Sequence, residues 1–237
     1  MRKLKAVTFS YDDGVKQDRR LIEIFNRYGL KGTFNVPSGQ LNHCNLMKLP
    51  DGTRLPPEEY ASVLREVYRG HEVAGHTLTH PNLNCEVDDD AEVIRQVEGD
   101  RLQLSELMGY EIVGMAYPGG GVNYNEHVAE VIRKHTGAQY ARTTVSTHSF
   151  APNQNLYTLH PTGRPYHDEF DKMFELAHEF IALEPDTPQI FYIWGHAYEF
   201  DREDSWERME EFCRLISGRD DIFYGTNKEV ILRDQWE

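Results

Sequence analysis

Strand patterns and helix patterns alternate along the whole 237-residue chain. Short apolar runs rich in β-branched and aromatic residues are followed by stretches in which apolar residues recur every three or four positions, which is typical of strands followed by amphipathic helices. The strands are predicted at 6–10, 32–36, 73–74, 112–117, 139–143, 157–160, 189–194 and 222–224. The helices are predicted at 16–28, 57–70, 88–108, 126–135, 168–183 and 206–216, with a final helical turn near residue 229.

Because no linker separates two halves, the alternation predicts a single α/β domain over residues 1–237 with a parallel sheet. Its seven or eight strand–helix units favour a closed or nearly closed barrel over an open doubly wound sheet.

The composition excludes several classes of protein. No apolar run reaches the roughly 18 residues of a transmembrane helix, and the N-terminus has no apolar signal-peptide core, so the chain as written is expected to be cytoplasmic. A signal segment that was removed stays an open alternative. The formal net charge of −14 disfavours nucleic acids and anionic membranes as partners and favours a neutral or cationic substrate. The three cysteines are far apart and are expected to be reduced. Nothing in the sequence predicts an oligomeric state.

Two adjacent acids follow the first predicted strand, in the stretch Thr8-Phe9-Ser10-Tyr11-Asp12-Asp13-Gly14. In α/β folds the carboxyl ends of parallel strands lie at one edge of the sheet, where ligands collect. The alternative is an ordinary Asp-Asp-Gly turn, in which Asp bonds its own backbone and Gly supplies a positive φ.

Three histidines also come directly after predicted strands. His76 and His80 follow the strand at 73–74, and His196 follows the strand at 189–194. Two imidazoles and one carboxylate are a typical ligand set for a catalytic zinc-type centre, so Asp13, His76 and His80 are the candidate metal ligands and Asp12 stays free as a base. Surface histidines remain the alternative, since the chain contains 11.

These motifs resemble those of the polysaccharide deacetylases of carbohydrate esterase family 4, the NodB-homology domains. The stretch Thr8 to Gly14 resembles the family's T-F-D-D-G motif with two intervening residues, and His76-Thr77-Leu78-Thr79-His80 resembles H-[ST]-x-x-H. Tyr117-Pro118-Gly119 stands where an R-x-P motif is expected, and Trp194-Gly195-His196 resembles a terminal L-x-H. The resemblance implies a distorted (β/α) barrel of about seven parallel strands, similar to a TIM barrel.

The resemblance also implies an activity and a set of roles. A divalent ion, zinc first and cobalt or nickel as alternatives, would be held by Asp13, His76 and His80. Asp12 would be the catalytic base and His196 the acid that protonates the leaving amine, while a backbone N–H near Tyr117 would stabilise the oxyanion. The substrate would be an acetylated amino sugar or glycan, with O-acetyl esters as an alternative to N-acetyl groups. Independently of the resemblance, Trp194 and Tyr117 are aromatic candidates for substrate contact, with a packing role in the core or a loop as the alternative.

The sequence departs from the family pattern in two places. Ala116 occupies the position of the arginine that orients the catalytic aspartate, and Arg142 is predicted to take over this role, with Arg164 as the weaker candidate. A surface arginine is the alternative in each case. The family's fourth motif, which supplies an aspartate to the catalytic histidine, has no clear counterpart, so the partner of His196 is unassigned.

Two other functions stay open as alternatives, and the departures motivate the second of them. One is a metal-independent hydrolase of C–N bonds from the same superfamily, such as the enzymes that open cyclic ureides. The other is a carbohydrate-binding protein without activity, built on a decayed deacetylase barrel.

Overall fold

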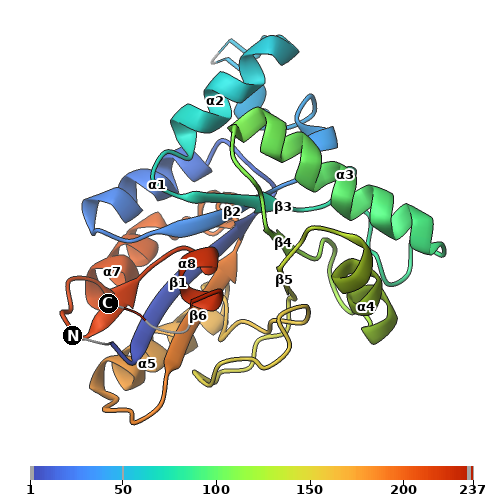
Figure 1. Cartoon of the computed structure of the whole chain (residues 1–237). Helices are drawn as coiled ribbons and strands as arrows, with labels where there is room; N and C mark the ends of the chain where they lie inside the picture. Colours follow the sequence, from blue (N-terminus) through green and yellow to red (C-terminus); the bar gives the residue numbers. More distant parts are fainter. Residues whose placement is uncertain (1–2, 50, 234–235, 237) are drawn as a thin grey trace.

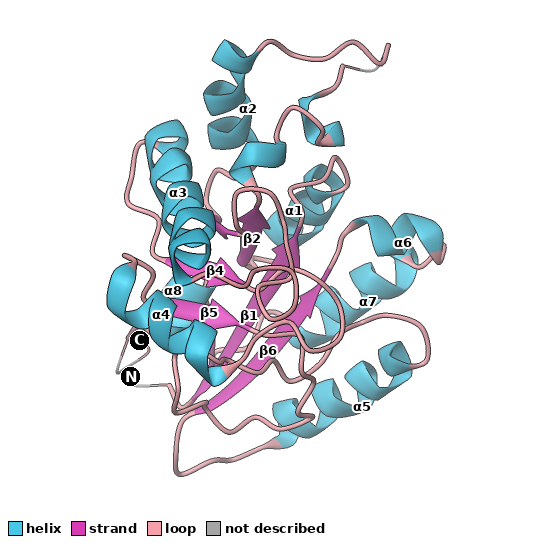
Figure 2. Ribbon diagram, turned by 90° about the vertical axis from the view of Figure 1, so that its right-hand side faces the viewer, coloured by secondary structure: helices cyan, strands magenta, loops and turns pink. Residues whose placement is uncertain are grey.

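In the part of the chain that the structure describes, seven parallel strands form one curled sheet with helices around its outside (Figures 1 and 2). The computed structural model describes residues 3–49, 51–233 and 236. The strands are β1 (Lys5–Asp12), β2 (Gly32–Val36), β3 (Glu72–Gly75), β4 (Gly114–Ala116), β5 (Tyr140–Arg142), β6 (Gln189–Gly195) and β7 (Ile222–Tyr224). The α-helices are α1 (Asp18–Arg27), α2 (Tyr60–Val67), α3 (Asp90–Met108), α4 (Glu126–His135), α5 (Glu169–Ala182), α6 (Tyr198–Arg202), α7 (Trp206–Ile216) and α8 (Asn227–Ile231). The predicted α/β class with a parallel sheet is therefore confirmed.

β1 is paired along both edges in the sheet, which has the order β5-β4-β3-β2-β1-β6 with β7 also paired to β1. β6 pairs with β1 from Lys5 to Tyr11, β2 pairs with its end from Phe9 to Asp12, and β7 pairs with its start from Lys5 to Val7. All eight residues of β1 are buried, as expected for a strand covered on both faces.

Because side chains alternate in direction along β1, the side chain of Asp12 points toward the inside of the barrel. Val7, Phe9 and Tyr11 pack into the main hydrophobic core, where the ring of Phe9 lies 4.6 Å from that of Phe25 of α1. Because successive side chains of a strand point to opposite faces, the residues between them face the other way. This other face is polar: the hydroxyl of Thr8 donates to the side chain of Asn227 (2.9 Å).

The gap between β5 and β6 is closed by extended chain rather than by a regular strand. Leu159 forms a parallel bridge with Arg142 of β5, and Gly163 forms one with Ile193 of β6. The strand predicted at 157–160 is therefore reduced to isolated bridges, and the regular part of the sheet is an open half-barrel.

Other differences from the predicted elements are small. The helix predicted at 57–70 begins as a 3₁₀ turn, η3 (Pro57–Glu59), before α2, and the 37–56 segment contains two more such turns, η1 (Ser38–Gln40) and η2 (Asn45–Met47). The strand predicted at 112–117 is shortened to β4. Helix α6 was not predicted, because five residues are too few to show a helical period.

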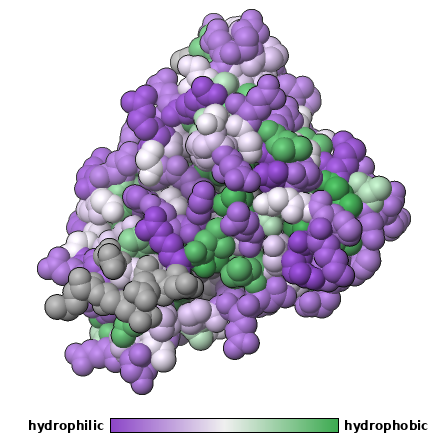
Figure 3. Space-filling model, viewed as in Figure 1, coloured by the Kyte–Doolittle hydropathy of each residue, from purple (hydrophilic) through white to green (hydrophobic). Residues whose placement is uncertain are grey.

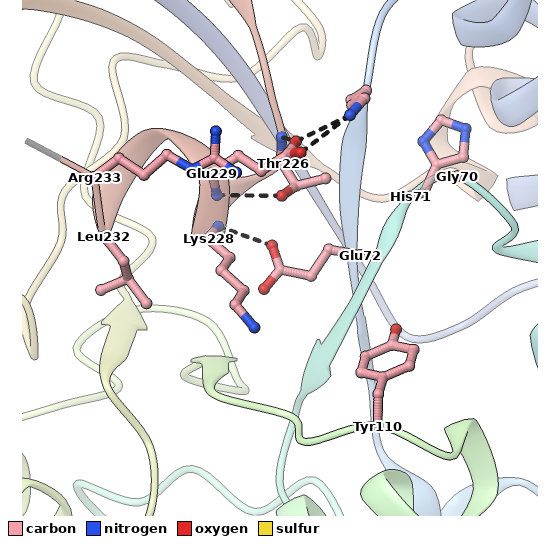
Figure 4. Close-up of a pocket in the computed structure, with 10 residues that line it drawn as sticks. Gly70, His71, Glu72, Tyr110, Thr226, Lys228, Glu229, Leu232 and Arg233 are labelled. Atoms are coloured by element: carbon pink, nitrogen blue, oxygen red, sulfur yellow. Dashed lines mark hydrogen bonds and ion pairs between the residues drawn. The ribbon is translucent and has the colours of Figure 1, made fainter. Parts of the chain in front are cut away.

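α8 lies at the end of the barrel away from the strand C-termini, where it lines the pocket shown in Figure 4 together with Glu72 and Tyr110. Thr226 and Glu229 form a capping box at the start of this helix. The backbone N–H of Lys228 donates to the buried carboxylate of Glu72 (2.9 Å), which also accepts from Tyr140 (2.9 Å). This end is therefore fixed by a buried polar cluster.

The face of the molecule shown in Figure 3 is mostly hydrophilic, with small separate hydrophobic areas. None of the helices in the described residues combines the length and the apolar character that a membrane crossing requires.

Candidate metal centre

The three predicted metal ligands lie together beyond the C-termini of β1 and β3. Asp13 Oδ1 is 3.6 Å from Nε2 of His76 and 3.4 Å from Nε2 of His80. One possible ligand atom from each of the three residues lies within 4.8 Å of the other two. One carboxylate and two imidazoles at this spacing fit a divalent cation that keeps open positions for water and substrate.

The backbone of these segments is strained where the ligands are placed. Asp13 has a φ of +78°, Thr77 of +63° and His80 of +61°. This left-handed region is uncommon for residues other than glycine and is an outlier for a β-branched residue such as Thr77. Strain of this kind costs about 1–3 kcal/mol per residue and persists where the surroundings determine the conformation, often at functional sites.

Contacts behind His76 set the direction of its free nitrogen. The ring Nδ1 lies 2.9 Å from the carbonyl oxygen of Ala116, which only accepts, so Nδ1 carries the proton and Nε2 faces Asp13 with its lone pair. The backbone N–H of His76 donates to Asp100 Oδ2 (2.8 Å), a fully buried carboxylate whose pKa is raised to about 7 by burial. Support from a second layer of hydrogen bonds is typical of metal-binding histidines.

Asp12 is held beside this cluster by Arg142. Nη2 of Arg142 lies 2.5 and 2.6 Å from the two carboxylate oxygens of Asp12, and Asn35 donates to Oδ1 at 2.8 Å. Both charged side chains are buried, with 2% of Asp12 and none of Arg142 exposed. Burial raises the pKa of Asp12, but the charges of Arg142, His76 and His196 outweigh it and keep that pKa below its usual value. The structure thus places Arg142, from the end of β5, where the sequence analysis expected it.

His196 approaches the same carboxylates from the end of β6. Its Nε2 lies 4.0 Å from Asp12 Oδ2 and 3.9 Å from Asp13 Oδ2. Its Nδ1 lies 3.1 Å from Oε1 of Glu199, and Arg164 holds the same oxygen at 2.6 Å. Burial lowers the pKa of His196, but the hydrogen bond to Glu199 and the nearby carboxylates raise it above the ordinary value overall.

Glu199 is the residue of this site that the sequence analysis missed. It is 4% exposed and lies three positions after His196, the spacing at which side chains meet on a helical turn. The two candidate arginines have different partners in the structure. Arg142 pairs with Asp12, and Arg164 pairs with Glu199.

Tyr117 and Trp194 line the cavity but are already engaged by protein groups. The backbone N–H of Tyr117 donates to the carbonyl of Arg142 (2.9 Å), so it is not available to an oxyanion. The glycines that follow it, Gly119 to Gly121, line the cavity and are the backbone groups near Tyr117 that remain for this role. The Trp194 ring is 4% exposed and lies against the guanidinium groups of Arg142 (4.7 Å) and Arg164 (5.0 Å).

The three candidate ligands, Asp12 and His196 line one cavity of about 520 Å³. Its lining includes both aspartates, all three histidines and a wall formed by Trp194, Tyr198 and Arg164. The site therefore combines a candidate metal set, a buried carboxylate outside that set, and an imidazole with its own carboxylate partner.

Comparisons with known proteins bear on the family and the fold. The sequence model of the polysaccharide deacetylase family matches residues 2–140, which include Asp12, Asp13, His76 and His80. Among solved structures, a protein from Mycobacterium smegmatis described as a polysaccharide deacetylase is 18% identical, with a TM-score of 0.67, covering 98% of this chain and 90% of its own. A family 4 carbohydrate esterase from Streptomyces lividans, solved with acetate, is 14% identical, with a TM-score of 0.54, covering 94% and 92%.

A third similar structure is a pseudoenzyme of the CE4 family from Bacillus anthracis, which is 13% identical with a TM-score of 0.57 and covers 98% of this chain and 66% of its own. The search of curated proteins gave no significant match. At these identities the solved structures support the fold alone. The match over residues 2–140, more than half of the chain, goes further: this chain belongs to the polysaccharide deacetylase family.

Proposed function

We propose that this protein is a metal-dependent hydrolase that removes N-acetyl groups from an acetylated amino sugar or glycan, with O-acetyl esters as a second class of substrate. The observation that carries the proposal is the arrangement of Asp12 and His196 beside the set of Asp13, His76 and His80 in one cavity. A hydrolysis of an amide needs both a base for water and an acid for the leaving nitrogen, and the cavity contains a candidate for each.

We expect Asp13, His76 and His80 to bind zinc, with cobalt or nickel as substitutes, because imidazole and carboxylate ligands suit all three ions. When bound, the cation polarises the acetyl carbonyl and lowers the pKa of a water molecule. The fixed tautomer of His76 and the left-handed backbone of Asp13 and His80 hold the ligand atoms in place.

The protein residues perform the proton transfers. Asp12, kept ionised and oriented by Arg142, accepts the proton of the attacking water as its oxygen bonds to the acetyl carbon. Backbone N–H groups of the 119–121 glycines stabilise the oxyanion. When the C–N bond breaks, Nε2 of His196 donates a proton to the leaving nitrogen, giving the free amine and acetate. Glu199 keeps the Nδ1 proton of His196 in place and stabilises its charged form.

The test combines metal analysis with acetate release. Treatment with a chelator is expected to lower the rate of acetate release by at least 100-fold, and zinc or cobalt is expected to restore it. His80→Ala should lose both metal and activity, whereas His127→Ala should retain them, because His127 is an exposed histidine paired with Asp90 outside the site. Full activity in protein shown to be metal-free would favour a metal-independent C–N hydrolase. Sugar binding without acetate release would favour a non-catalytic binding protein.

Glu199→Gln is expected to lower kcat by about 10- to 100-fold with little change in KM or metal content, since the amide keeps the shape but not the charge beside His196. Glu203→Gln is the matched control. Glu203 lies a few residues after Glu199 in the sequence, but it pairs with the exposed His167 (3.0 Å). Equal kcat values for the two variants would remove Glu199 from the mechanism.

A further inference from the structure

A second hollow, of about 780 Å³, lies beside the metal centre on the same side of the barrel. Four basic residues line it: Lys16, Arg19 and Arg20 at the start of α1, and Lys48 from the segment that follows η2. We call this hollow, with these four residues, the basic groove.

The charge of the basic groove is opposite to that of the protein. The chain has 39 acidic and 25 basic residues, yet four basic side chains gather here, and all four are exposed. Among the described residues, none of the four forms an ion pair within 4 Å. A cleft lined by one sign of charge concentrates ligands of the other sign.

The acidic residue in the lining, Asp201, does not neutralise these cations by direct pairing. Its carboxylate accepts hydrogen bonds from the indole N–H of Trp206 (2.6 Å) and the side-chain amide of Gln17 (2.8 Å), which are neutral donors. The basic groove therefore retains a surplus of positive charge and cationic groups that are free to bind an anion.

Apolar groups lie between the cations. The buried ring of Trp206 has the guanidinium of Arg20 at 4.5 Å, and Leu46, Leu49 and Leu55 complete this part of the lining. Leu49 is 44% exposed. Apolar surface with a few convergent polar groups is the usual lining of a site for an organic ligand, so the basic groove suits an organic molecule that carries anionic groups better than a simple ion.

The basic groove is close to the metal centre. Lys16 follows the candidate ligand Asp13 by three residues, so their Cα atoms lie within about 11 Å. The short helix α6 links the two hollows, since Tyr198 lines the metal cavity and Asp201 lines the basic groove. A single chain-like ligand is therefore able to occupy both.

We propose that the basic groove binds the carboxylates of an acidic glycan, so that uronate units lie in the groove while a neighbouring N-acetylated sugar lies in the metal centre. The second half of this statement rests on the proposed function, and the first half does not. The net charge alone favours a neutral or cationic substrate, but the local distribution of charge reverses this preference at the basic groove.

The test is isothermal titration calorimetry with two hexasaccharides that both contain N-acetylglucosamine: a hyaluronan hexasaccharide, which alternates it with glucuronate, and neutral chitohexaose. At low ionic strength the hyaluronan hexasaccharide is expected to bind about 10-fold more tightly, and the difference should shrink as salt is added. The double variant Lys16→Gln/Arg19→Gln should lose most of this difference. The matched control Arg133→Gln/Lys134→Gln neutralises two exposed cations that pair with Glu130 on α4 and should keep it.

Three results would overturn the proposal. The first is equal affinity for the two hexasaccharides, and the second is an equal loss of the affinity difference in the control variant. The third is equally tight binding of a single-stranded oligonucleotide of matched charge, which would indicate general attraction of anions. Each titration is performed on zinc-treated and chelated protein, and acetate release is measured separately. Selective binding of the hyaluronan hexasaccharide without acetate release from any glycan would refute the proposed function alone. Acetate release without selective binding would refute the basic groove alone.

Discussion

Asparagine in place of Asp12 is expected to lower kcat for acetate release by about 1,000-fold while metal content stays unchanged. Asp12 lies outside the candidate ligand set, its carboxylate is 3.9 Å from Nε2 of His76, and it lines the same cavity. An amide cannot accept the proton of the attacking water, and loss of a positioned base typically costs 10²- to 10⁴-fold in rate. The measurement pairs steady-state acetate release with metal analysis of the same sample.

Asp18→Asn is the matched control for this experiment. Asp18 is also a fully buried aspartate near the end of β1, but its carboxylate accepts a hydrogen bond from Tyr68 (2.7 Å) and does not line the metal cavity. Its pKa is raised well above the usual value by burial. Activity of Asp18→Asn is expected to stay within about threefold of the wild type. Asp12→Asn with more than a tenth of the wild-type rate would show that another group acts as the base.

Methionine in place of Arg142 is expected to have the largest effect on stability. The change leaves the carboxylate of Asp12 buried without its cation, and breaking a buried ion pair in this way costs about 3–5 kcal/mol. It also removes the group that orients Asp12, so the rate of acetate release should fall as well. Urea unfolding gives the first quantity, and acetate release well below the unfolding temperature gives the second. Arg142→Lys should recover part of the stability, because it keeps the charge but not the planar group over Trp194.

A double-mutant cycle separates the ion pair from other contacts of Arg142. The double variant Asp12→Asn/Arg142→Met has neither buried charge, so its loss of stability should be smaller than the sum of the two single losses by about 1–3 kcal/mol. Losses that add within about 0.5 kcal/mol would mean that the two side chains do not stabilise each other.

The fold and the main cluster were predictable because they depend on strong local patterns and one general rule. Apolar periodicity marks the strands, and parallel strands place their carboxyl ends at one edge, so residues that follow different strands were expected to meet. The structure brings Asp13, His76 and His80 together in this way. The position of Arg142 followed from the same rule, since it ends β5.

The remaining features depend on tertiary contacts that leave little trace in the sequence. Glu199 lies on a helix of five residues, and its partner Arg164 comes from the irregular chain that closes the barrel. The engagement of the Tyr117 N–H by Arg142 is a cross-strand hydrogen bond, so it depends on register rather than on residue type. The basic groove was hidden by the net charge, which sums over the whole surface and carries no information about position.

The pairing of β1 along both of its edges has a consequence for how the chain folds. β1, which ends in Asp12, precedes the other strands of this sheet in the chain, yet it pairs with β6 and β7, and its Thr8 bonds Asn227, which is 219 residues further along the chain. Contacts between such distant segments form slowly, because a long loop must close before they contribute any stability. Until β6 is available, an incomplete chain presents the hydrogen-bonding edge of its longest strand, which is fully buried in the folded protein, to solvent, and this favours aggregation. We therefore expect the edge that bears the candidate site to assemble late in folding, and the yield of folded protein to depend on how well the unpaired edge of β1 is protected until then.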